Sequence, residues 1–316
     1  MNAPDDSTGR VAVIIPTHNR ATLLPRAIDS VLAQTEAGCC DIVVVDDGST
    51  DATPQAVRAY GDRIQYLRHP VSRGAAAARN TGIVASHGEF VAFLDDDDTW
   101  LPDKVAHQRA AMARWPACVL VAGCAFDRYA DGDLRARPRP AVPRDQLVDL
   151  APHLLRDNFL STPLVMVRRA ALMRAGLFDP ELQRAEDYHM WVRLALVGPG
   201  VVLDHPIACL SPDRPHGLSD DKPAMVTARL VAHRKLRPAL RGRPDCRAAW
   251  QAGWVSRLAT ARDVYFRGGQ FGTAARYGAA LLWHAPCRPA WEWRRTAAAL
   301  CRALAGMGRQ RPEVAP

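Results

Sequence analysis

The sequence predicts an α/β protein: a mostly parallel sheet flanked by helices, followed by a helical C-terminal region. Short apolar runs typical of buried strands alternate with segments of helical periodicity in the first hundred residues, which favours parallel strands joined by helices. The charge is divided, because residues 222–316 carry 18 Lys and Arg against 4 Asp and Glu, while the rest carry 23 against 29. We therefore expect a loose tail over residues 1–9, an α/β domain over residues 10–220 and a basic helical region over residues 221–316.

The first two predicted strands each lead into a loop and a helix. Residues 11–15 form an uninterrupted apolar run, and apolar residues recur at helical spacing between positions 23 and 32. Residues 41–46 form the second apolar run, and the Gly, Ser, Thr and Asp of positions 47–51 favour a turn before a capped helix. Two such units in succession predict parallel strands with right-handed crossovers.

Two further strands complete the predicted parallel part of the sheet. Residues 64–68 are a shorter strand candidate, and residues 74–86 form a helix rich in small residues that can lie close against a sheet. Gly88 and Glu89 then start the strand that ends at Asp95.

Four consecutive carboxylates, Asp95 to Asp98, close this last apolar run. A strand interior does not hold such charges without compensation, so we expect them at the strand's carboxyl end, where open parallel sheets bind ligands. The loops over residues 17–20 and 46–51 should open at the same edge. Carboxylate oxygens suit Mg²⁺ or Mn²⁺, which takes one or two of them together with water and substrate phosphates. A solvated acidic turn is the alternative for the four carboxylates alone.

Composition argues against several other classes. With 316 residues, 48% of them hydrophobic, the chain is large enough for a real core. Its eight cysteines lack paired CxxC spacing, and its N-terminus lacks the pattern of a signal peptide. The longest apolar stretch, residues 117–126, is about half of what a membrane-spanning helix needs. We expect a cytoplasmic protein with reduced thiols, with peripheral attachment at the inner face of a membrane as an open alternative.

Four sequence blocks occur in order: VAVIIPTHNR at 11–20, VVDDGSTD at 44–51, RGAAAARNTG at 73–82 and GEFVAFLDDDD at 88–98. They resemble the inverting family 2 glycosyltransferases, and residues 176–195 are similar to the family's block that carries the catalytic base. The resemblance covers roughly residues 10–220 and implies the GT-A fold. It also implies transfer of a sugar from a nucleoside-diphosphate sugar to an acceptor hydroxyl.

The resemblance assigns roles to the acidic loop. Asp95 and Asp97 match the family's DxD motif, which makes Asp97 the expected ligand of Mn²⁺ or Mg²⁺. Asp96 is expected near the ribose or the sugar hydroxyls. His216 lies in a segment similar to a loop that offers a histidine to the metal or the diphosphate; a merely solvated histidine is the alternative.

Other residues are expected at the nucleotide. Asp47 resembles the residue that accepts a hydrogen bond from the nucleobase, with a helix N-cap as its alternative role. Pro16, Thr17, Asn19 and Arg20 would line the nucleoside and its diphosphate. Arg79 resembles an arginine that contacts the diphosphate, and an ion pair with one of the acidic loops is its alternative.

The proposed general base is Asp187, with Glu186 beside it to position the acceptor or the loop. Inversion needs one carboxylate to take the proton of the acceptor hydroxyl as its oxygen attacks the anomeric carbon. Both residues fall in the first turn of a predicted amphipathic helix, where the helix dipole favours an ionised carboxylate. Acidic residues also occur in first turns for stability alone, which is the alternative explanation.

The resemblance also bears on the kind of transfer. Processive members carry a Gln-x-x-Arg-Trp motif after the base and usually membrane helices; residues 247–250 match that motif poorly. Transfer of one sugar is therefore implied, from a UDP-sugar in first place, to a glycan or lipid-linked acceptor in envelope or extracellular glycan synthesis. A nucleotidyltransferase and a non-catalytic nucleotide-sugar-binding module stay open as other classes. No nucleic acid partner is expected.

From Met225 onward the pattern is helical, with an antiparallel helix pair predicted over residues 257–267 and 271–284. Five tryptophans of this region are interleaved with arginines, which suits a membrane interface. The alternative is that they pack into the region's own core. They are Trp250, Trp254, Trp283, Trp291 and Trp293.

Overall fold

The computed structural model of the protein describes residues 8–212, 220–285 and 290–307. The chain forms two compact units. The first holds the described residues up to 212 apart from 155–157, and the second holds residues 155–157 and the described residues from 220 onward.

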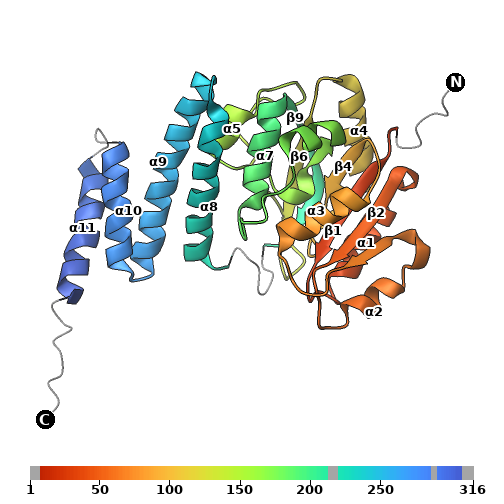
Figure 1. The fold of residues 1–316 in the computed structure, drawn as a ribbon, viewed down its shortest axis with the longest axis horizontal. Helices are drawn as coiled ribbons and strands as arrows, with labels where there is room; N and C mark the ends of the chain where they lie inside the picture. The colour runs from red at the N-terminus through yellow and green to blue at the C-terminus, as the bar shows by residue number, and fades with distance from the viewer. Residues whose placement is uncertain (1–7, 213–219, 286–289, 308–316) are drawn as a thin grey trace, which may run out of the picture. The chain divides into compact units, whose positions relative to one another are not determined.

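The first unit is built on a mixed nine-stranded sheet in the order β3-β2-β1-β4-β8-β6-β9-β5, with β7 paired to β6 (Figure 1). Its first four strands pair in parallel, as the sequence predicted. An α-helix follows each of β1, β2 and β3, whereas β4 is followed by the short strand β5. The elements of this half are β1 (Val11–Thr17), α1 (Leu24–Leu32), β2 (Cys40–Asp46), α2 (Thr53–Arg58), β3 (Gln65–Arg68), α3 (Ala75–Ala85) and β4 (Phe90–Phe93).

Antiparallel pairing begins where the chain continues past β4. The strand β8 lies antiparallel between β4 and β6, whereas β6 and β9 are parallel to each other. The remaining elements of the unit are β5 (Thr99–Trp100), α4 (Lys104–Arg114), β6 (Leu120–Arg128), β7 (Leu134–Ala136), β8 (Met166–Arg168), α6 (Arg169–Ala175), α7 (Glu186–Val197) and β9 (Gly200–Leu210). Helix α5 (Ala151–Arg156) begins in the first unit, and its last two residues belong to the second.

The central strand β1 is buried along its whole length. Because side chains alternate along a strand, its two faces meet different helices. Val13 and Ile15 belong to the same apolar cluster as Leu24 and Ile28 of α1. Ile14 points the other way, toward α3, where Gly82 allows the helix to approach the sheet closely.

Replacing Gly82 by Ala should lower the free energy of unfolding by about 1–3 kcal/mol, the usual range for overpacking a core. An added Cβ would lie 2.6 Å from Cγ2 of Ile14 and 3.2 Å from Cγ2 of Val45. Urea denaturation would measure the change. Gly38→Ala is the matched control, because no atom lies within 4 Å of its added Cβ. Equal unfolding midpoints for both variants would contradict close packing at Gly82.

The second unit is helical. Its helices α8 (Lys222–Leu236), α9 (Pro244–Arg267), α10 (Phe271–His284) and α11 (Ala290–Met307) lie side by side in sequence order (Figure 1). A short 3-10 helix, η4 (Arg237–Leu240), leads from α8 toward α9. None of the described helices combines the length and the hydropathy that crossing a bilayer requires.

The predicted helix pair is present as α9 and α10, but α9 begins thirteen residues before the predicted position 257. Pro244 sits in its first turn, where proline needs no hydrogen-bonding N–H. Gly253 lies within the helix, and a Cβ there would be 1.9 Å from the carbonyl oxygen of Leu155. The close approach of the two backbones therefore requires a glycine at this position.

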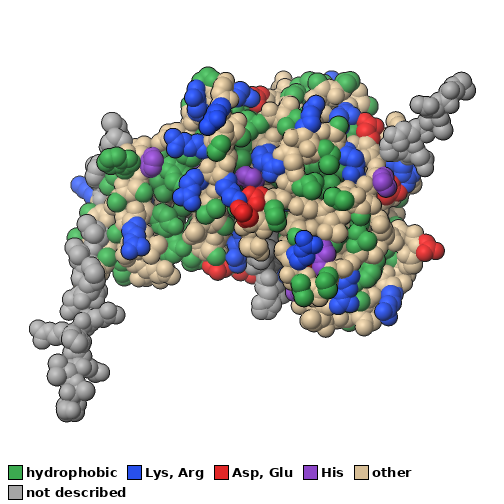
Figure 2. All heavy atoms as spheres, in the orientation of Figure 1, with side chains coloured by type: hydrophobic (Ala, Val, Ile, Leu, Met, Phe, Trp, Pro, Cys, Tyr) green, Lys and Arg blue, Asp and Glu red, His purple; other side chains and the backbone are tan. Residues whose placement is uncertain are grey.

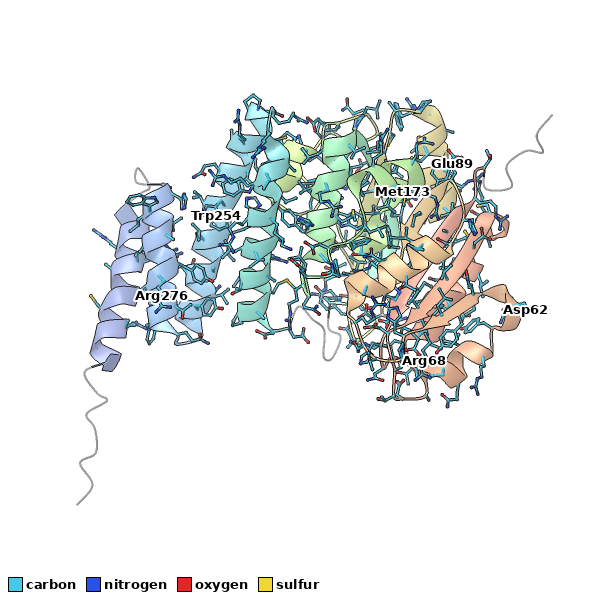
Figure 3. The ribbon with its side chains drawn as sticks, viewed as in Figure 1. Asp62, Arg68, Glu89, Met173, Trp254 and Arg276 are labelled. Carbon is cyan, nitrogen blue, oxygen red and sulfur yellow. The ribbon has the colours of Figure 1, made fainter. Side chains whose placement is uncertain are left out.

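The tryptophans of the second unit do not form one exposed set. Trp250 is buried and stacks on His233 at 5.1 Å between ring centroids. It also stacks, at 5.6 Å, on Trp254, which is labelled in Figure 3. Trp283 is 85% exposed, and the side chains of Trp291 and Trp293 lie outside the described part of the chain. The prediction that these tryptophans face a membrane is therefore wrong for Trp250, which packs into the unit's own core.

Candidate active site

Three loops meet at the carboxyl edge of the parallel strands. Thr17 at the end of β1 is in register with Asp46 at the end of β2. The backbone N–H of Leu94 donates to the carbonyl of Ile14 at 3.1 Å, which carries the pairing of β4 up to Asp95. The loops that follow these three strands therefore open at one edge, as parallel pairing requires.

Asp47 is fixed by the loop that follows β3. Its carboxylate lies 2.6 Å from Nδ1 of His69 and accepts hydrogen bonds from the Ser72 hydroxyl and from the backbone N–H groups of Arg73 and Gly74. Burial alone would raise the pKa of Asp47, but these hydrogen bonds outweigh it and lower the pKa. A nucleobase would have to displace one of these donors, so the predicted nucleobase contact stays a prediction.

The alternative role of Asp47 as a helix cap is wrong. Helix α2 begins at Thr53 with Ala52 at the N-cap position. The nearby carboxylate of Asp51 instead accepts from the backbone N–H of Thr53 at 2.9 Å.

Asn19 ties the loop after β1 to the loop after β2. Its backbone N–H donates to the Ser49 hydroxyl at 2.9 Å, and its side-chain oxygen accepts from the N–H of Thr50 at 2.7 Å. The backbone N–H of Arg20 donates to the hydroxyl of Thr53. Asn19 has a φ of 54°, a left-handed conformation that Asn tolerates better than most residues. These contacts show loop support, and contact with a nucleotide stays a prediction for both residues.

Pro16 and Thr17 are the last residues of β1, and both are buried. Burial raises the pKa of Asp96, and a hydrogen bond from the Thr17 side chain opposes that shift. The Thr17 hydroxyl thus faces the acidic loop, and contact of Pro16 and Thr17 with a nucleotide stays a prediction.

The backbone of the acidic loop is fixed by hydrogen bonds from Arg26 of α1 and from Ser211, which follows β9. Both donate to the carbonyl oxygen of Asp97, at 2.8 and 2.7 Å. The backbone N–H of Ser211 donates to the carboxylate of Asp98 at 2.8 Å. The carboxylate of Asp98 thus braces the loop.

Asp96 titrates unusually for a carboxyl group. Burial raises its pKa to about 7, and the neighbouring charges of Asp97 and Asp95 act in the same direction. A cation at this loop would offset the mutual repulsion of the carboxylates and lower that pKa. The loop is therefore electrostatically suited to a positive ligand.

Arg79 of α3 joins the acidic loop to the start of α7. It is 5% exposed, and its two terminal nitrogens lie 2.8 Å from Asp95 Oδ1 and 2.7 Å from Glu186 Oε1. Burial would lower the pKa of Arg79, but these two carboxylates raise it, so the guanidinium stays charged. The ion-pair alternative is what the structure shows, and contact with a diphosphate stays a prediction. Removing one partner of such a buried pair typically costs about 3–5 kcal/mol.

Asp187 lies beside this ion pair in the first turn of α7. Its Oδ1 accepts from the backbone N–H of Tyr188 at 2.6 Å. Burial raises the pKa of Asp187 to about 6, and the charge of Glu186 adds to the shift. Such a carboxylate is ionised at neutral pH yet more basic than an ordinary one. The preceding residue, Ala185, has a φ of 60°, in the left-handed region that residues with a Cβ seldom adopt.

A cluster of three aromatic rings packs next to the site. Phe93 is in β4, Phe178 precedes α7, and Trp191 is in α7; their ring centroids lie 5.4 to 5.8 Å apart. Asn80 of α3 exchanges two hydrogen bonds with the backbone of Phe178, at 2.8 and 2.9 Å. Asn80 and Phe178 lie within the sequence blocks described above, but no role was predicted for either. The sequence did indicate Asn80 indirectly, because it is a polar residue next to Arg79 in a helix of small residues.

The donor set fits a metal shared with a substrate. Among the described residues, no three His, Cys, Asp or Glu side chains converge to hold an ion, and His216 lies outside the described residues. Mg²⁺ and Mn²⁺ commonly take one or two carboxylates and complete their shell with water and phosphate oxygens. Asp97 and Asp95 are the residues that would hold such an ion.

A sheet whose parallel half continues into antiparallel strands, with carboxylates at its carboxyl edge, has the architecture of the GT-A glycosyltransferases. The profile of Glycosyl transferase family 2 matches residues 12–175, and the chain belongs to this family. The predicted family and fold class are therefore confirmed.

Several curated proteins are similar in sequence. The succinoglycan biosynthesis protein ExoU of Rhizobium meliloti is 30% identical over 261 residues, which cover 78% of this chain and 74% of ExoU. An uncharacterized glycosyltransferase of Rickettsia prowazekii, RP339, is 29% identical over 200 residues. The chain spans 62% of the length of that protein.

Solved structures share the fold at lower identity. S. aureus TarS 1–349 in complex with UDP-GlcNAc matches with a TM-score of 0.69 and 19% identity, over 93% of this chain and 88% of that one. The mannosyltransferase PcManGT of Pyrobaculum calidifontis, in complex with GDP-Man and Mn²⁺, matches with a TM-score of 0.58 and 23% identity, over 96% and 88%. At these identities the matches support the fold.

Proposed function

We propose that the protein is a non-processive inverting glycosyltransferase that uses a divalent metal. It transfers one sugar from a nucleoside-diphosphate sugar, with a UDP-sugar in first place, to an acceptor hydroxyl. The observation that carries the proposal is the buried Arg79, which ties the acidic loop at Asp95 to Glu186, the neighbour of Asp187. A metal-binding loop and a basic carboxylate are thereby held at one site.

In the proposed reaction the chain's own residues hold the substrates and move one proton. Asp187 accepts the proton of the acceptor hydroxyl as its oxygen attacks the anomeric carbon opposite the departing diphosphate. Arg79 is paired with Glu186, which places a fixed positive charge close to the neighbouring Asp187. Thr17, buried at the end of β1, lines the nucleoside. Mg²⁺ or Mn²⁺ held by Asp97 and Asp95 would neutralise the leaving diphosphate.

Similar proteins suggest the kind of product. ExoU is named for succinoglycan biosynthesis, and WcaA of Escherichia coli, 29% identical over 198 residues, is a putative colanic acid biosynthesis glycosyl transferase. TarS was solved with UDP and with UDP-GlcNAc, and PcManGT with GDP-Man. We infer synthesis of an envelope or extracellular glycan on a glycan or lipid-linked acceptor, with the nucleotide to be decided by experiment.

The test is release of nucleoside diphosphate from a panel of UDP- and GDP-sugars in Mn²⁺. A glycosyltransferase without acceptor should slowly hydrolyse its own donor and leave the others intact. Formation of a nucleotide sugar with release of pyrophosphate would instead indicate a nucleotidyltransferase. If the protein binds a donor tightly but releases no nucleoside diphosphate with any acceptor tested, it is a non-catalytic binding module. That result would overturn the proposal.

The rate should depend on the ionisation of Asp187. Because the base acts as a carboxylate and its pKa is about 6, kcat/KM should rise with pH through this value. At one pH unit below the pKa it should be about ten-fold lower than the plateau. The measurement is a pH profile at saturating metal.

The matched variant for the pH profile is Glu186→Gln. Because the charge of Glu186 raises the pKa of Asp187, its removal should move the rising limb to lower pH. A profile that is flat between pH 5 and 8 would contradict the assignment of Asp187.

We also propose that the basic C-terminal region contacts an anionic membrane surface peripherally. The charge of +14 over residues 222–316 and the exposed Trp283 support this, since basic residues near such a surface contribute on the order of 1 kcal/mol each. The full-length protein should sediment with phosphatidylglycerol-containing vesicles at low salt and be released at high salt. A protein that ignores these vesicles at low salt would refute the contact.

A further inference from the structure

The second unit contains a pocket of about 540 Å³ whose charged lining consists of four arginines. They are Arg234, Arg237, Arg241 and Arg247. From this pocket we propose a binding site for a di- or polyphosphate group, either free or as the headgroup of a lipid. The site lies entirely within the helical unit, so it stands or falls independently of the proposed glycosyl transfer.

The four arginines come from a short stretch of the chain that turns sharply. Arg234 is in the last turn of α8, Arg237 is in η4, Arg241 follows η4, and Arg247 is in the first turns of α9. Gly242 has a φ of 80° in the turn between them, a conformation that glycine adopts without strain. A turn between two helices thus gathers guanidinium groups around one hollow.

Charge compensation is missing within the pocket. The structure shows no hydrogen bond or ion pair from these four guanidinium groups to any described residue, and no carboxylate lines the pocket. The nearby Asp245 is paired with Arg243, and the distance from Arg243 Nη2 to Asp245 Oδ2 is 2.8 Å. Like charges held close together repel each other. A bound anion of several charges would remove that repulsion.

In the view of Figure 2, several Lys and Arg side chains gather over the upper ends of α8 and α9. The region from residue 222 to the end holds only four acidic residues. Two of the described ones, Asp245 and Asp263, are already paired with arginines. The neighbourhood of the pocket therefore adds to its positive potential.

The size and the walls of the pocket favour a small phosphate-rich ligand. Its volume is within the range of about 300–1,000 Å³ typical of small-molecule sites. An arginine guanidinium can donate two parallel hydrogen bonds to two phosphate oxygens. Four guanidinium groups carry more positive charge than one carboxylate would neutralise. Trp250 forms an aromatic wall, with the Arg237 guanidinium 5.4 Å from its ring centroid. A diphosphate with an organic substituent would use both the charges and this wall.

Isothermal titration of the full-length protein with inorganic pyrophosphate, in buffer with chelator, tests the site. The chelator suppresses binding of pyrophosphate through a metal at the acidic loop. The double variant Arg234→Ala with Arg247→Ala should raise the Kd at least about ten-fold, since each charge-assisted hydrogen bond contributes substantially. Arg229→Ala is the matched control: it removes an exposed arginine from the same helix α8, outside the pocket.

The Arg229→Ala control should keep the wild-type Kd, whereas an equal loss in control and double variant would mean diffuse charge and overturn the proposal. Failure of the wild-type protein to bind pyrophosphate would overturn it as well. Should the double variant fold poorly, Arg241→Ala repeats the test at an exposed position outside the helices. All of these outcomes are independent of donor hydrolysis.

Vesicles distinguish the two sources of the anion. Phosphatidylcholine vesicles with and without diacylglycerol pyrophosphate, whose headgroup is a diphosphate, are offered to wild type, the double variant and Arg229→Ala. Loss of diacylglycerol pyrophosphate binding in the double variant alone would assign the pocket to a lipid headgroup. Pyrophosphate binding that depends on the pocket, without such a difference on vesicles, would assign it to a soluble di- or polyphosphate.

Discussion

Asp187→Asn should lower the turnover rate by two or more orders of magnitude while leaving donor affinity near normal. Loss of a general base usually reduces a rate by about 10²–10⁴-fold. The amide is nearly isosteric, and its oxygen can still accept from the N–H of Tyr188, so helix α7 should keep its first turn. Single-turnover kinetics with saturating donor would measure the chemical step, and titration with the nucleoside diphosphate would measure binding.

The control for Asp187→Asn is Asp62→Asn, a similar loss of charge at an exposed residue (Figure 3) in the 3-10 helix Gly61–Arg63. It should retain wild-type turnover. If donor binding by Asp187→Asn collapses while turnover at saturation persists, Asp187 supports the structure of the site and another group is the base. If Asp187 is the base, the residual rate of Asp187→Asn should no longer rise with pH through about 6.

Asp97→Asn should abolish turnover in Mn²⁺ and weaken binding of the nucleoside diphosphate, with the fold intact. The change removes a hard, charged oxygen that Mn²⁺ and Mg²⁺ prefer. The backbone carbonyl of Asp97, which anchors the loop to Arg26 and Ser211, is unaffected by it. Diphosphate affinity with and without Mn²⁺ would show the loss directly.

Asp98→Asn is the control for Asp97→Asn. The carboxylate of Asp98 accepts from the backbone of Ser211, so its change should reduce stability by about 1 kcal/mol and preserve metal dependence. Full activity of the wild-type protein in excess chelator would refute a catalytic metal. Equal loss of metal-dependent binding in both variants would show that the loop's overall charge matters more than Asp97 as a ligand.

Sequence patterns predicted the parallel half of the sheet because each strand there is a local apolar run followed by its own helix. Residues 11–15, 41–46 and 64–68 lie within or overlap β1, β2 and β3. The antiparallel strands were not predicted. Strand β8 has three residues, Met166–Arg168, too few to show a period of two. Its place between β4 and β6 depends on partners far away in the chain.

The same distinction applies to the site. The acidic loop was visible from sequence, because four adjacent carboxylates end an apolar run. The bridge formed by Arg79 was visible only as one of two alternatives, since its partners lie 16 and 107 positions away. The engagement of Asp47 by the loop over residues 69–74 was not predicted either. No local pattern tells which distant donors will surround a buried carboxylate.

The ion pair between Arg79 and Glu186 also has a consequence for how the chain reaches its native state. Contacts between distant positions form late, because the entropy of closing the intervening loop must be lost before the contact stabilises anything. A chain emerging from the ribosome exposes Arg79 and Asp95 long before Glu186 is made. During that interval the parallel half can condense while the second carboxylate partner of Arg79 is missing. The complete bridge from Arg79 to both carboxylates can therefore form only after synthesis has reached α7.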